Sequence, residues 1–240
     1  MGGREFLNEI DITRWCLFIS DDLLIEANKI NYIKDRIDKV IPNPIKIYRM
    51  NSSREATKKL ALKPHKFGEL RYKNTKSMII PATTSERRKY IPIGFYEIKK
   101  NIVISNSAQA IYNAEYWIFG VIHSYIHNVW VKSVGGYLGT SIRYSTILCY
   151  NTFPFPKITQ TQKNKIEELV HIILDERDKN YTKTMAELYD PKKMPEGLKT
   201  AHHNLDLYIE SCYRDKPFEN DEERLEYLFK LYEKMVKEEK

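Results

Sequence analysis

Residues 84–95 read Thr-Ser-Glu-Arg-Arg-Lys-Tyr-Ile-Pro-Ile-Gly-Phe, with three adjacent cations and one carboxylate ahead of an apolar run. The short run over residues 90–93 predicts a β-strand, and its proline favours a sheet edge or a strand end. Arginine can fork onto a guanine edge or a phosphate, lysine neutralises phosphate, and a carboxylate can accept from the cytosine amino group. The stretch therefore predicts a strand beside polar side chains suited to nucleic acid.

Basic residues are concentrated around this stretch. The 240-residue chain has a formal net charge of +7. Residues 45–100 contain 15 lysines and arginines against four acidic residues, whereas residues 157–240 contain 16 against 19. A local basic block is the expected footprint of a surface that binds a polyanion. The alternative is a solvated lysine-rich surface with no ligand.

Short apolar runs and helical periodicity alternate along the rest of the chain, which is 42% hydrophobic and can bury a core. The expected strands cover residues 14–19, 78–81, 90–93, 101–104 and 143–150. The expected helices cover residues 21–41, 51–62, 109–132, 161–180, 195–212 and the segment after a capping-box sequence at 220–223. We expect an α+β fold: a mixed β-sheet domain with packed helices over residues 1–156, then a small helical lobe over residues 157–240.

The sequence lacks the motifs of several catalytic classes. It contains no glycine-rich phosphate loop, no Asn/Asp-Pro-Pro-aromatic motif and no aspartate between residues 39 and 174, so Glu97 has no aspartate nearby for metal-dependent nuclease chemistry. His123 and His127 have zinc-like spacing without the zincin glutamate, and we expect structural roles for them. We expect His202 and His203 near the surface. No catalytic residue and no metal site is predicted in this chain.

The cysteines and the hydropathy pattern bear on the compartment. Cys16, Cys149 and Cys212 are an odd, widely spaced set, which is neither a disulfide framework nor a zinc cluster and fits a reducing cytoplasm. No signal peptide precedes Arg4, and no apolar run of about 18 residues could span a bilayer. We expect a cytoplasmic protein with no membrane partner.

Several segments resemble, in the same order, the target-recognition domain and helical tail of MmeI-like restriction–modification enzymes. They cover residues 5–8, 14–18, 85–88, 90–95, 119–124, 130–131, 143–145, 150–156, 188–191, 194–195 and 201–202. Such enzymes resemble fusions of an endonuclease, an AdoMet-dependent adenine methyltransferase and this recognition domain. The resemblance implies that the chain reads double-stranded DNA for an adenine-N6 methyltransferase domain of the same parent protein. That domain would hold AdoMet, and we expect no cofactor and no enzymatic activity in this chain alone.

The family's base-contacting positions carry over to three segments of this sequence. The expected DNA-binding residues are Ser85, Glu86, Arg87, Arg88 and Lys89, then Asn106 and Ser107, and then Gly139, Ser141 and Arg143. Arg143 is suited to guanine O6 and N7, and Asn106 to adenine. Gly139 and Ser141 stand where relatives often carry charged side chains, which implies a different base preference. The alternative is that these residues have structural roles only: Arg87 then pairs with Glu86 or Glu97, and Asn106 caps a turn.

Two other functions remain open from the residues alone. Interleaved tyrosines and lysines also occur in modules that bind RNA or single strands. A protein-interaction domain, whose helical lobe docks on another subunit, would make the basic face incidental. A preference for single strands over duplex would favour the first alternative, and loss of partner binding on removing residues 157–240 would favour the second.

Overall fold

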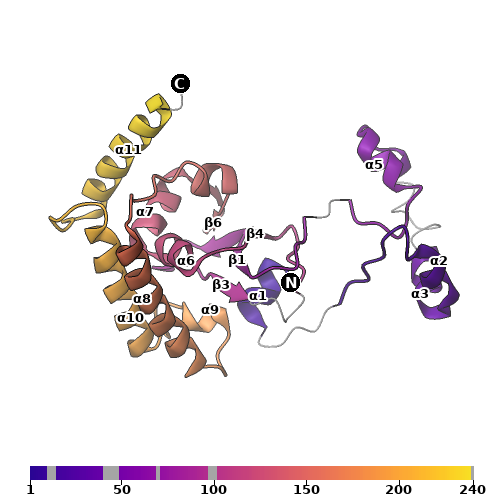
Figure 1. The fold of residues 1–240 in the computed structure, drawn as a ribbon, viewed down its shortest axis with the longest axis horizontal. Coiled ribbons are helices and arrows are strands. Elements are labelled where there is room, and N and C mark those ends of the chain that lie inside the picture. Colours follow the sequence, from indigo (N-terminus) through magenta and orange to yellow (C-terminus); the bar gives the residue numbers. More distant parts are fainter. Residues whose placement is uncertain (10–14, 40–48, 69–70, 97–101, 239–240) are drawn as a thin grey trace. The chain divides into compact units, whose positions relative to one another are not determined.

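The computed structural model describes residues 1–9, 15–39, 49–68, 71–96 and 102–238. They form two compact units, one made of Met1–Ile12 with Lys73–Lys240 and the other of Thr13–Tyr72 (Figure 1). The larger unit combines helices with antiparallel sheets, so the predicted α+β class is confirmed. Among the described residues, no helix is long and apolar enough to cross a membrane.

The first sheet of the larger unit has the strand order β3-β1-β4. Strand β1 (Ser77–Pro81) lies between β3 (Gly94–Tyr96) and β4 (Ala108–Tyr112), antiparallel to both. The strand predicted at residues 78–81 is therefore confirmed. The run at residues 90–93 is buried but forms no strand, because Pro92 has no N–H to donate and the Ile93 carbonyl accepts from the Arg177 guanidinium instead.

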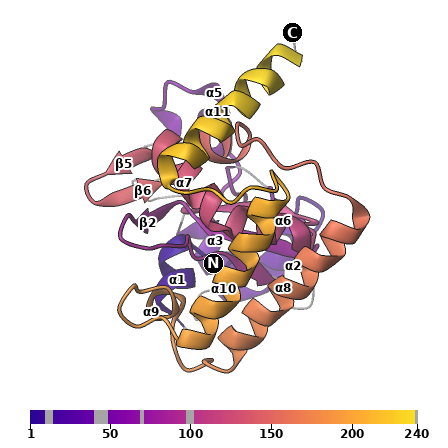
Figure 2. The ribbon, with the colours of Figure 1, turned by 90° about the vertical axis from the view of Figure 1, so that its left-hand side faces the viewer.

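The second sheet has the order β2-β6-β5. Strand β6 (Ser141–Arg143) lies between β2 (Thr83–Ser85) and β5 (Gly136–Leu138), antiparallel to both. Figure 2 shows these strands side by side. Only Ala82 separates β1 from β2, so the chain crosses from one sheet to the other at that residue.

Three further predictions for the central region are wrong. Residues 109–112 belong to β4 rather than to a helix, because pairing along β1 satisfies their backbone groups. Residues 102–104 form no strand, while residue 101 lies outside the described residues. Of the strand predicted at 143–150 only Arg143 is in a strand, and Thr146–Tyr150 forms a π-helix (η2) whose first turn is capped by the Ser145 hydroxyl.

The helix predicted over residues 109–132 is two helices, α6 (Tyr116–His123) and α7 (Tyr125–Val134). Ser124 breaks them apart with extended backbone angles, and its hydroxyl donates to the Val121 carbonyl at 2.6 Å. The three predicted C-terminal helices are confirmed as α8 (Gln160–Asp178), α10 (Glu196–Ser211) and α11 (Asp221–Glu238). Two short helices complete the unit, α1 (Gly3–Asn8) and α9 (Met185–Leu188).

One apolar core joins the strands to the C-terminal helices. Helices α8 and α10 pack along each other and cover α6, while the β3-β1-β4 sheet lies on the other side of α6 (Figures 1 and 2). The buried cluster includes Met78 of β1, Phe119 of α6, Ile166 of α8 and Leu205 of α10. The division at residue 157 stays a prediction about domain organisation, and in the structure residues on both sides of it share this core.

A close approach between α6 and α8 depends on Gly120. A Cβ atom at Gly120 would overlap Ile166 Cγ2 and stand 3.0 Å from Val170 Cγ2. Gly120→Ala should lower the free energy of unfolding by about 1–2 kcal/mol, since overpacking costs more than the gain in helix propensity. Chemical denaturation would measure this loss. Gly136→Ala is the matched control, because nothing lies within 4 Å of its Cβ position, and an equal loss in both variants would contradict the packing argument.

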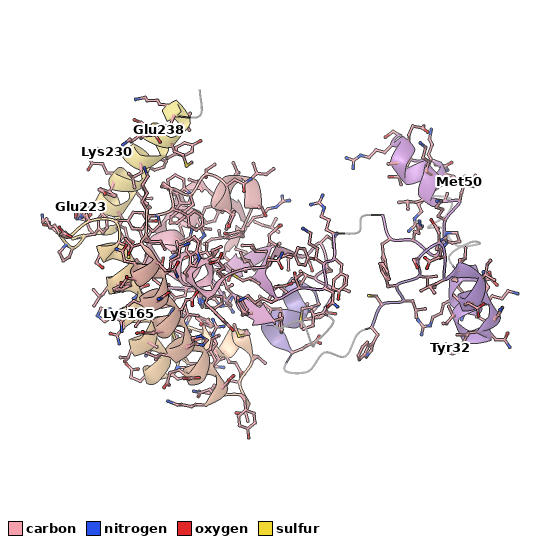
Figure 3. All side chains as sticks on the ribbon, viewed as in Figure 1. Tyr32, Met50, Lys165, Glu223, Lys230 and Glu238 are labelled. Carbon is pink, nitrogen blue, oxygen red and sulfur yellow. The ribbon has the colours of Figure 1, made fainter. Side chains whose placement is uncertain are left out.

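The smaller unit contains α2 (Leu24–Lys29), α3 (Asn31–Asp38) and α5 (Glu55–Leu60). The helix predicted over residues 21–41 is broken at Ile30, which is extended, and residues 40–41 lie outside the described residues. The helix predicted over 51–62 is confirmed over a shorter span. Exposed apolar side chains are frequent here, among them Tyr32 and Met50 (Figure 3).

The buried strand predicted at residues 14–19 is wrong over its described part. Residues 15–19 form no strand, and Trp15 is 92% exposed. A strand needs a neighbour to receive its backbone hydrogen bonds. The described residues of the smaller unit contain helices but no other strand, so no such neighbour is present there.

Candidate nucleic-acid interface

One face of the β2-β6-β5 sheet points outward. Directly opposed residues of antiparallel strands share a face, and successive residues alternate between faces. Thr84 and Ile142 are opposed and both buried, so their neighbours lie on the other side. We call that other side the reading face; it consists of Thr83, Ser85, Leu138, Ser141 and Arg143. Three of the predicted DNA-binding residues therefore share one face.

The turn before β4 joins the reading face through Ala82. The Ala82 N–H donates to the Ser107 carbonyl at 3.1 Å, and the Ala82 carbonyl accepts from the Tyr144 N–H at 2.9 Å. The structure thus brings the three predicted segments together. Asn106 is exposed in this turn, which precedes a strand and not a helix. The Ser107 hydroxyl accepts from the Gly3 N–H at 3.1 Å, so it also holds the start of α1.

Residues 85–89, which we call the recognition segment, turn away from the end of β2. The Arg88 N–H donates to the Ser85 carbonyl at 3.2 Å, and the Glu86 N–H donates to the Thr140 carbonyl at 3.2 Å. Glu86, Arg87 and Lys89 are exposed. Arg88 is half-buried, and its guanidinium donates to the Thr84 hydroxyl at 3.3 Å. Burial lowers the pKa of Arg88 from its ordinary value. Arg87 is therefore the more accessible of the two arginines.

Gly139 lies at the tip of the β5–β6 hairpin. Its φ of 60° is in the left-handed region, where glycine is favoured. Nothing lies within 4 Å of its Cβ position, so the tip is open. A glycine is therefore favoured at position 139 by the backbone conformation of the turn and not by a lack of space for a side chain. Next to it, Leu138 is 70% exposed on the reading face. Leu138 and Thr83 were not predicted from the sequence to belong to the reading face. In a hairpin, every second residue of a strand lies on the same face, and this alternation could have identified them.

Three histidines lie in the core near this site. His123 and His127 are buried, and burial lowers the pKa of both, that of His127 to about 3. Their predicted structural roles fit these positions, and His127 Nε2 lies 3.1 Å from the Tyr144 hydroxyl. The surface position predicted for His202 is wrong. It is fully buried because it falls on the apolar stripe of α10, whereas His203 is exposed.

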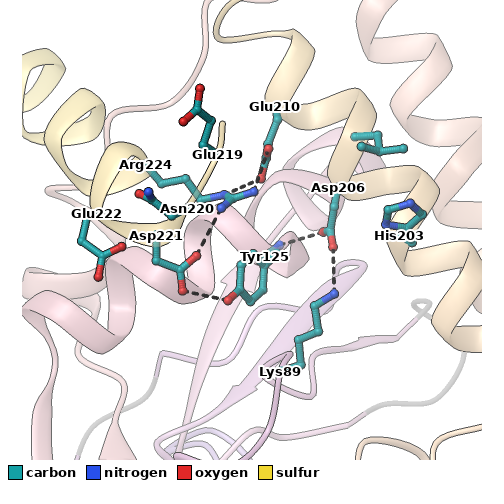
Figure 4. Close-up of a pocket in the computed structure, with 11 residues that line it drawn as sticks. Lys89, Tyr125, His203, Asp206, Glu210, Glu219, Asn220, Asp221, Glu222 and Arg224 are labelled. Carbon is teal, nitrogen blue, oxygen red and sulfur yellow. Dashed lines mark hydrogen bonds and ion pairs between the residues drawn. The ribbon is translucent and has the colours of Figure 1, made fainter. Parts of the chain in front are cut away.

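A pocket of about 600 Å³ opens between the recognition segment and the C-terminal helices (Figure 4). Its lining residues are Lys89, Tyr125, His203, Asp206, Leu207, Glu210, Glu219, Asn220, Asp221, Glu222 and Arg224. Carboxylates predominate inside it and would repel phosphate, so nucleic acid does not enter the pocket itself, whereas Lys89 at its edge is exposed. None of its lining residues is a glycine. In the part of the chain that the structure describes, no group of three or more His, Cys, Asp or Glu side chains could hold a metal ion.

Asp206 should make the stability depend on pH. Burial raises the pKa of Asp206 to about 6, above the ordinary aspartate value of 3.8. Its stabilising contribution is fully present below pH 3.8 and is lost as the pH rises to about 6. The free energy of unfolding of the wild type, minus that of Asp206→Asn, should fall by about 2 kcal/mol between pH 4 and pH 7. Urea denaturation at both pH values measures this change, and a constant difference would contradict it.

An outward sheet face with an exposed arginine, beside a basic segment, has the features of surfaces in the class of proteins that recognise nucleic acid. Residues 1–157 match the family model described as "MmeI, target recognition domain", and residues 158–239 match the one described as "MmeI, C-terminal domain". The chain belongs to the MmeI target recognition domain family.

Two known proteins are similar over nearly the whole chain. DNA methyltransferase A of Bacillus subtilis (strain 168) is 41% identical over 239 residues, which is 98% of this chain and 26% of that protein. The Type IIL restriction–modification enzyme MmeI, whose structure was solved in complex with DNA, is 38% identical, with a TM-score of 0.89 over 99% of this chain and 30% of that chain. The chain therefore spans less than a third of either relative.

Proposed function

We propose that this chain is the sequence-specific double-stranded DNA recognition module of a DNA methyltransferase. The observation that carries the proposal is the meeting of three segments around Ala82, which sets Ser85, Ser141 and Arg143 on one face with Asn106 in the adjoining turn. The match to MmeI, whose structure contains DNA, supports the same function. In this proposal the catalytic groups of the methyltransferase lie outside this chain, which spans 26% of DNA methyltransferase A.

The proposed contacts follow from side-chain chemistry. An antiparallel ribbon fits the major groove, where each base pair presents its own pattern of donors and acceptors. Arg143 forks onto a guanine, Asn106 pairs with an adenine, and Glu86 accepts from a cytosine amino group. Arg87, Arg88 and Lys89 neutralise phosphates at the rim. Ser85, Ser107 and Ser141 complete the polar surface, and Gly139 leaves the hairpin tip free to approach the groove.

Selection from a randomised duplex library tests the proposal directly. The 240-residue chain is incubated with the library at low salt, and the retained duplexes are sequenced. Enrichment of a motif of several base pairs is the expected result. Retention without enrichment would contradict sequence-specific recognition. Competition with single-stranded DNA and RNA in the same assay distinguishes a duplex reader from a module that binds single strands. The single-strand module predicts tighter binding to those competitors than to duplex.

Binding should weaken steeply with salt. Neutralising roughly five to eight phosphates gives a slope of log affinity against log salt of about −4.5 to −7, because bound counterions are released. Fluorescence anisotropy with a labelled duplex between 50 and 200 mM salt would measure the slope. A slope near zero would show that the basic residues do not face phosphate.

The activity of the parent protein is part of the same proposal. A methyltransferase domain outside this chain binds AdoMet and methylates adenine N6, in a cytoplasmic enzyme that also carries an endonuclease. Calorimetry should detect no AdoMet binding by the 240-residue chain. Mass spectrometry of DNA treated with the parent protein and AdoMet should find N6-methyladenine, and methylation of cytosine instead would overturn the choice of base.

A further inference from the structure

We propose that Asp206, on helix α10, is a positioning residue for DNA reading, which it supports through Tyr90 without touching the DNA. The inference rests on the proposed function, because the segment that it positions is the recognition segment. Tyr90 follows Lys89 directly and lies 116 residues before Asp206 in the sequence. Helix α10 belongs to the helical part of the chain that carries none of the predicted base contacts.

The recognition segment is held at both of its ends. At its start, β2 pairs with β6, which fixes Ser85 opposite Ser141. At its end, the Tyr90 hydroxyl donates to Asp206 Oδ2 at 2.7 Å, in a buried position. Residues 86–88 form the turn between these two fixed points, with Glu86 and Arg87 exposed and Arg88 half-buried. The base contact proposed for Glu86 needs its side chain placed within about 0.5 Å, so the fixed ends are what make this contact reproducible.

Asp206 also fixes the element on which the segment rests. Its other carboxylate oxygen, Oδ1, accepts from the Tyr125 N–H at 2.8 Å and so caps the start of α7 (Figure 4). From the same helix, the Asn128 side-chain amide donates to the Lys89 carbonyl, and also to the Arg88 carbonyl at 3.5 Å. One carboxylate therefore couples α10 to α7 and to the end of the recognition segment.

Two further contacts restrict the end of the segment. The Tyr90 ring stacks on His202, one turn before Asp206, with ring centroids 4.1 Å apart. The Lys89 ammonium lies 4.0 Å from Asp206 Oδ2 and over the rings of Tyr90 and Tyr125. The lysine thereby has a preferred direction before any DNA is bound, and Asp206 sets that direction.

Glu210 provides a matched control on the same helix. It is a buried carboxylate one turn after Asp206, and it accepts from the Arg224 guanidinium at 2.7 and 3.1 Å (Figure 4). Its partner lies on α11 and not on the recognition segment. Loss of either carboxylate disturbs the packing of α10, but only the loss of Asp206 frees Tyr90. The two variants therefore separate positioning from general stability.

The experiment compares the wild-type chain with Asp206→Asn, Tyr90→Phe and Glu210→Gln. Each folded variant goes through the duplex selection, and amide hydrogen exchange is measured without DNA over residues 85–91. We expect Asp206→Asn and Tyr90→Phe to lower discrimination at the bases read by the recognition segment about 5- to 20-fold, and to speed exchange there. The preference given by Arg143 should remain. Glu210→Gln should keep the wild-type base preferences and exchange rates.

The double variant Tyr90→Phe/Asp206→Asn should lose no more discrimination than Asp206→Asn alone, because both substitutions remove the hydrogen bond between Tyr90 and Asp206. Unchanged exchange over residues 85–91 in Asp206→Asn would overturn the proposal, with or without DNA binding. Equal changes of base discrimination and exchange in Glu210→Gln would show that the effect of Asp206→Asn comes from a general loss of stability and not from positioning. If the wild type itself enriches no motif, the proposed function fails, whereas the exchange comparison still decides whether Asp206 positions the segment.

Discussion

Arg143→Ala should remove the preference for one base pair and leave the other positions of the bound motif unchanged. A bidentate arginine–guanine pair discriminates by about 1–3 kcal/mol, which is roughly 5- to 150-fold in relative affinity. Arg143 is exposed on the reading face, at the end of the central strand of its sheet. Its backbone position is set by pairing with Thr83 on one side and Gly136 on the other. Truncation should therefore remove a contact without moving the scaffold.

Lys89→Ala gives the contrasting result that makes the Arg143 experiment specific. A lysine that meets phosphate contributes to every sequence alike, so its loss should weaken all duplexes and reduce the salt slope by about one. Both variants are measured against duplexes that differ at single positions of the selected motif. Uniform weakening by Arg143→Ala would refute its role as a base reader.

Trp130→Ala should cause the largest loss of stability. Trp130 is almost fully buried in α7, with its ring centroid 6.3 Å from that of Phe153 and 5.0 Å from that of Phe229 on α11. Its indole N–H has no hydrogen-bond partner among the described residues, so the variant loses packing alone. A cavity of this size costs about 3–5 kcal/mol and should lower the Tm by roughly 6–20 °C. Thermal unfolding followed by circular dichroism measures the shift.

Trp15→Ala is the control for the same substitution at an exposed site. Trp15 is 92% exposed, so its truncation should change the free energy of unfolding by no more than about 0.5 kcal/mol. Equal effects of the two variants would show that Trp130 does not hold α11 to α7. Because Asn128, also on α7, binds the recognition segment, Trp130→Ala should in addition weaken DNA binding when it is assayed below its Tm.

The parts of the fold that could be predicted are those in which local sequence and tertiary environment agree. Helices α8, α10 and α11 have apolar residues at spacings of three and four, and the buried side of each follows that stripe. The Asn220 side chain accepts from the Glu223 N–H at 2.9 Å, as the expected capping sequence requires. Residues 78–81 are apolar throughout, which fits the fully buried central strand β1.

The predictions of secondary structure fail where the local spacing of apolar residues favours one element and long-range pairing favours another. Residues 109–132 have helical spacing, yet the first four of them pair with β1, and the break at Ser124 leaves no trace in the apolar periodicity. The candidate site shows the same limit. Its segments were identified from a resemblance to a family, while their meeting at Ala82 and the role of Asp206 depend on contacts between residues far apart in the sequence.

Composition, local periodicity and short motifs were sufficient to predict the fold class, the C-terminal helices, the basic block over residues 45–100 and the family. Contacts between distant parts of the chain establish which strands pair, which side of β6 faces outward and which carboxylate holds Tyr90. The physical reason is that a strand's backbone groups and a buried polar side chain are satisfied by partners distant in the chain. Those partners are fixed by the packing of the whole unit, which no local pattern records.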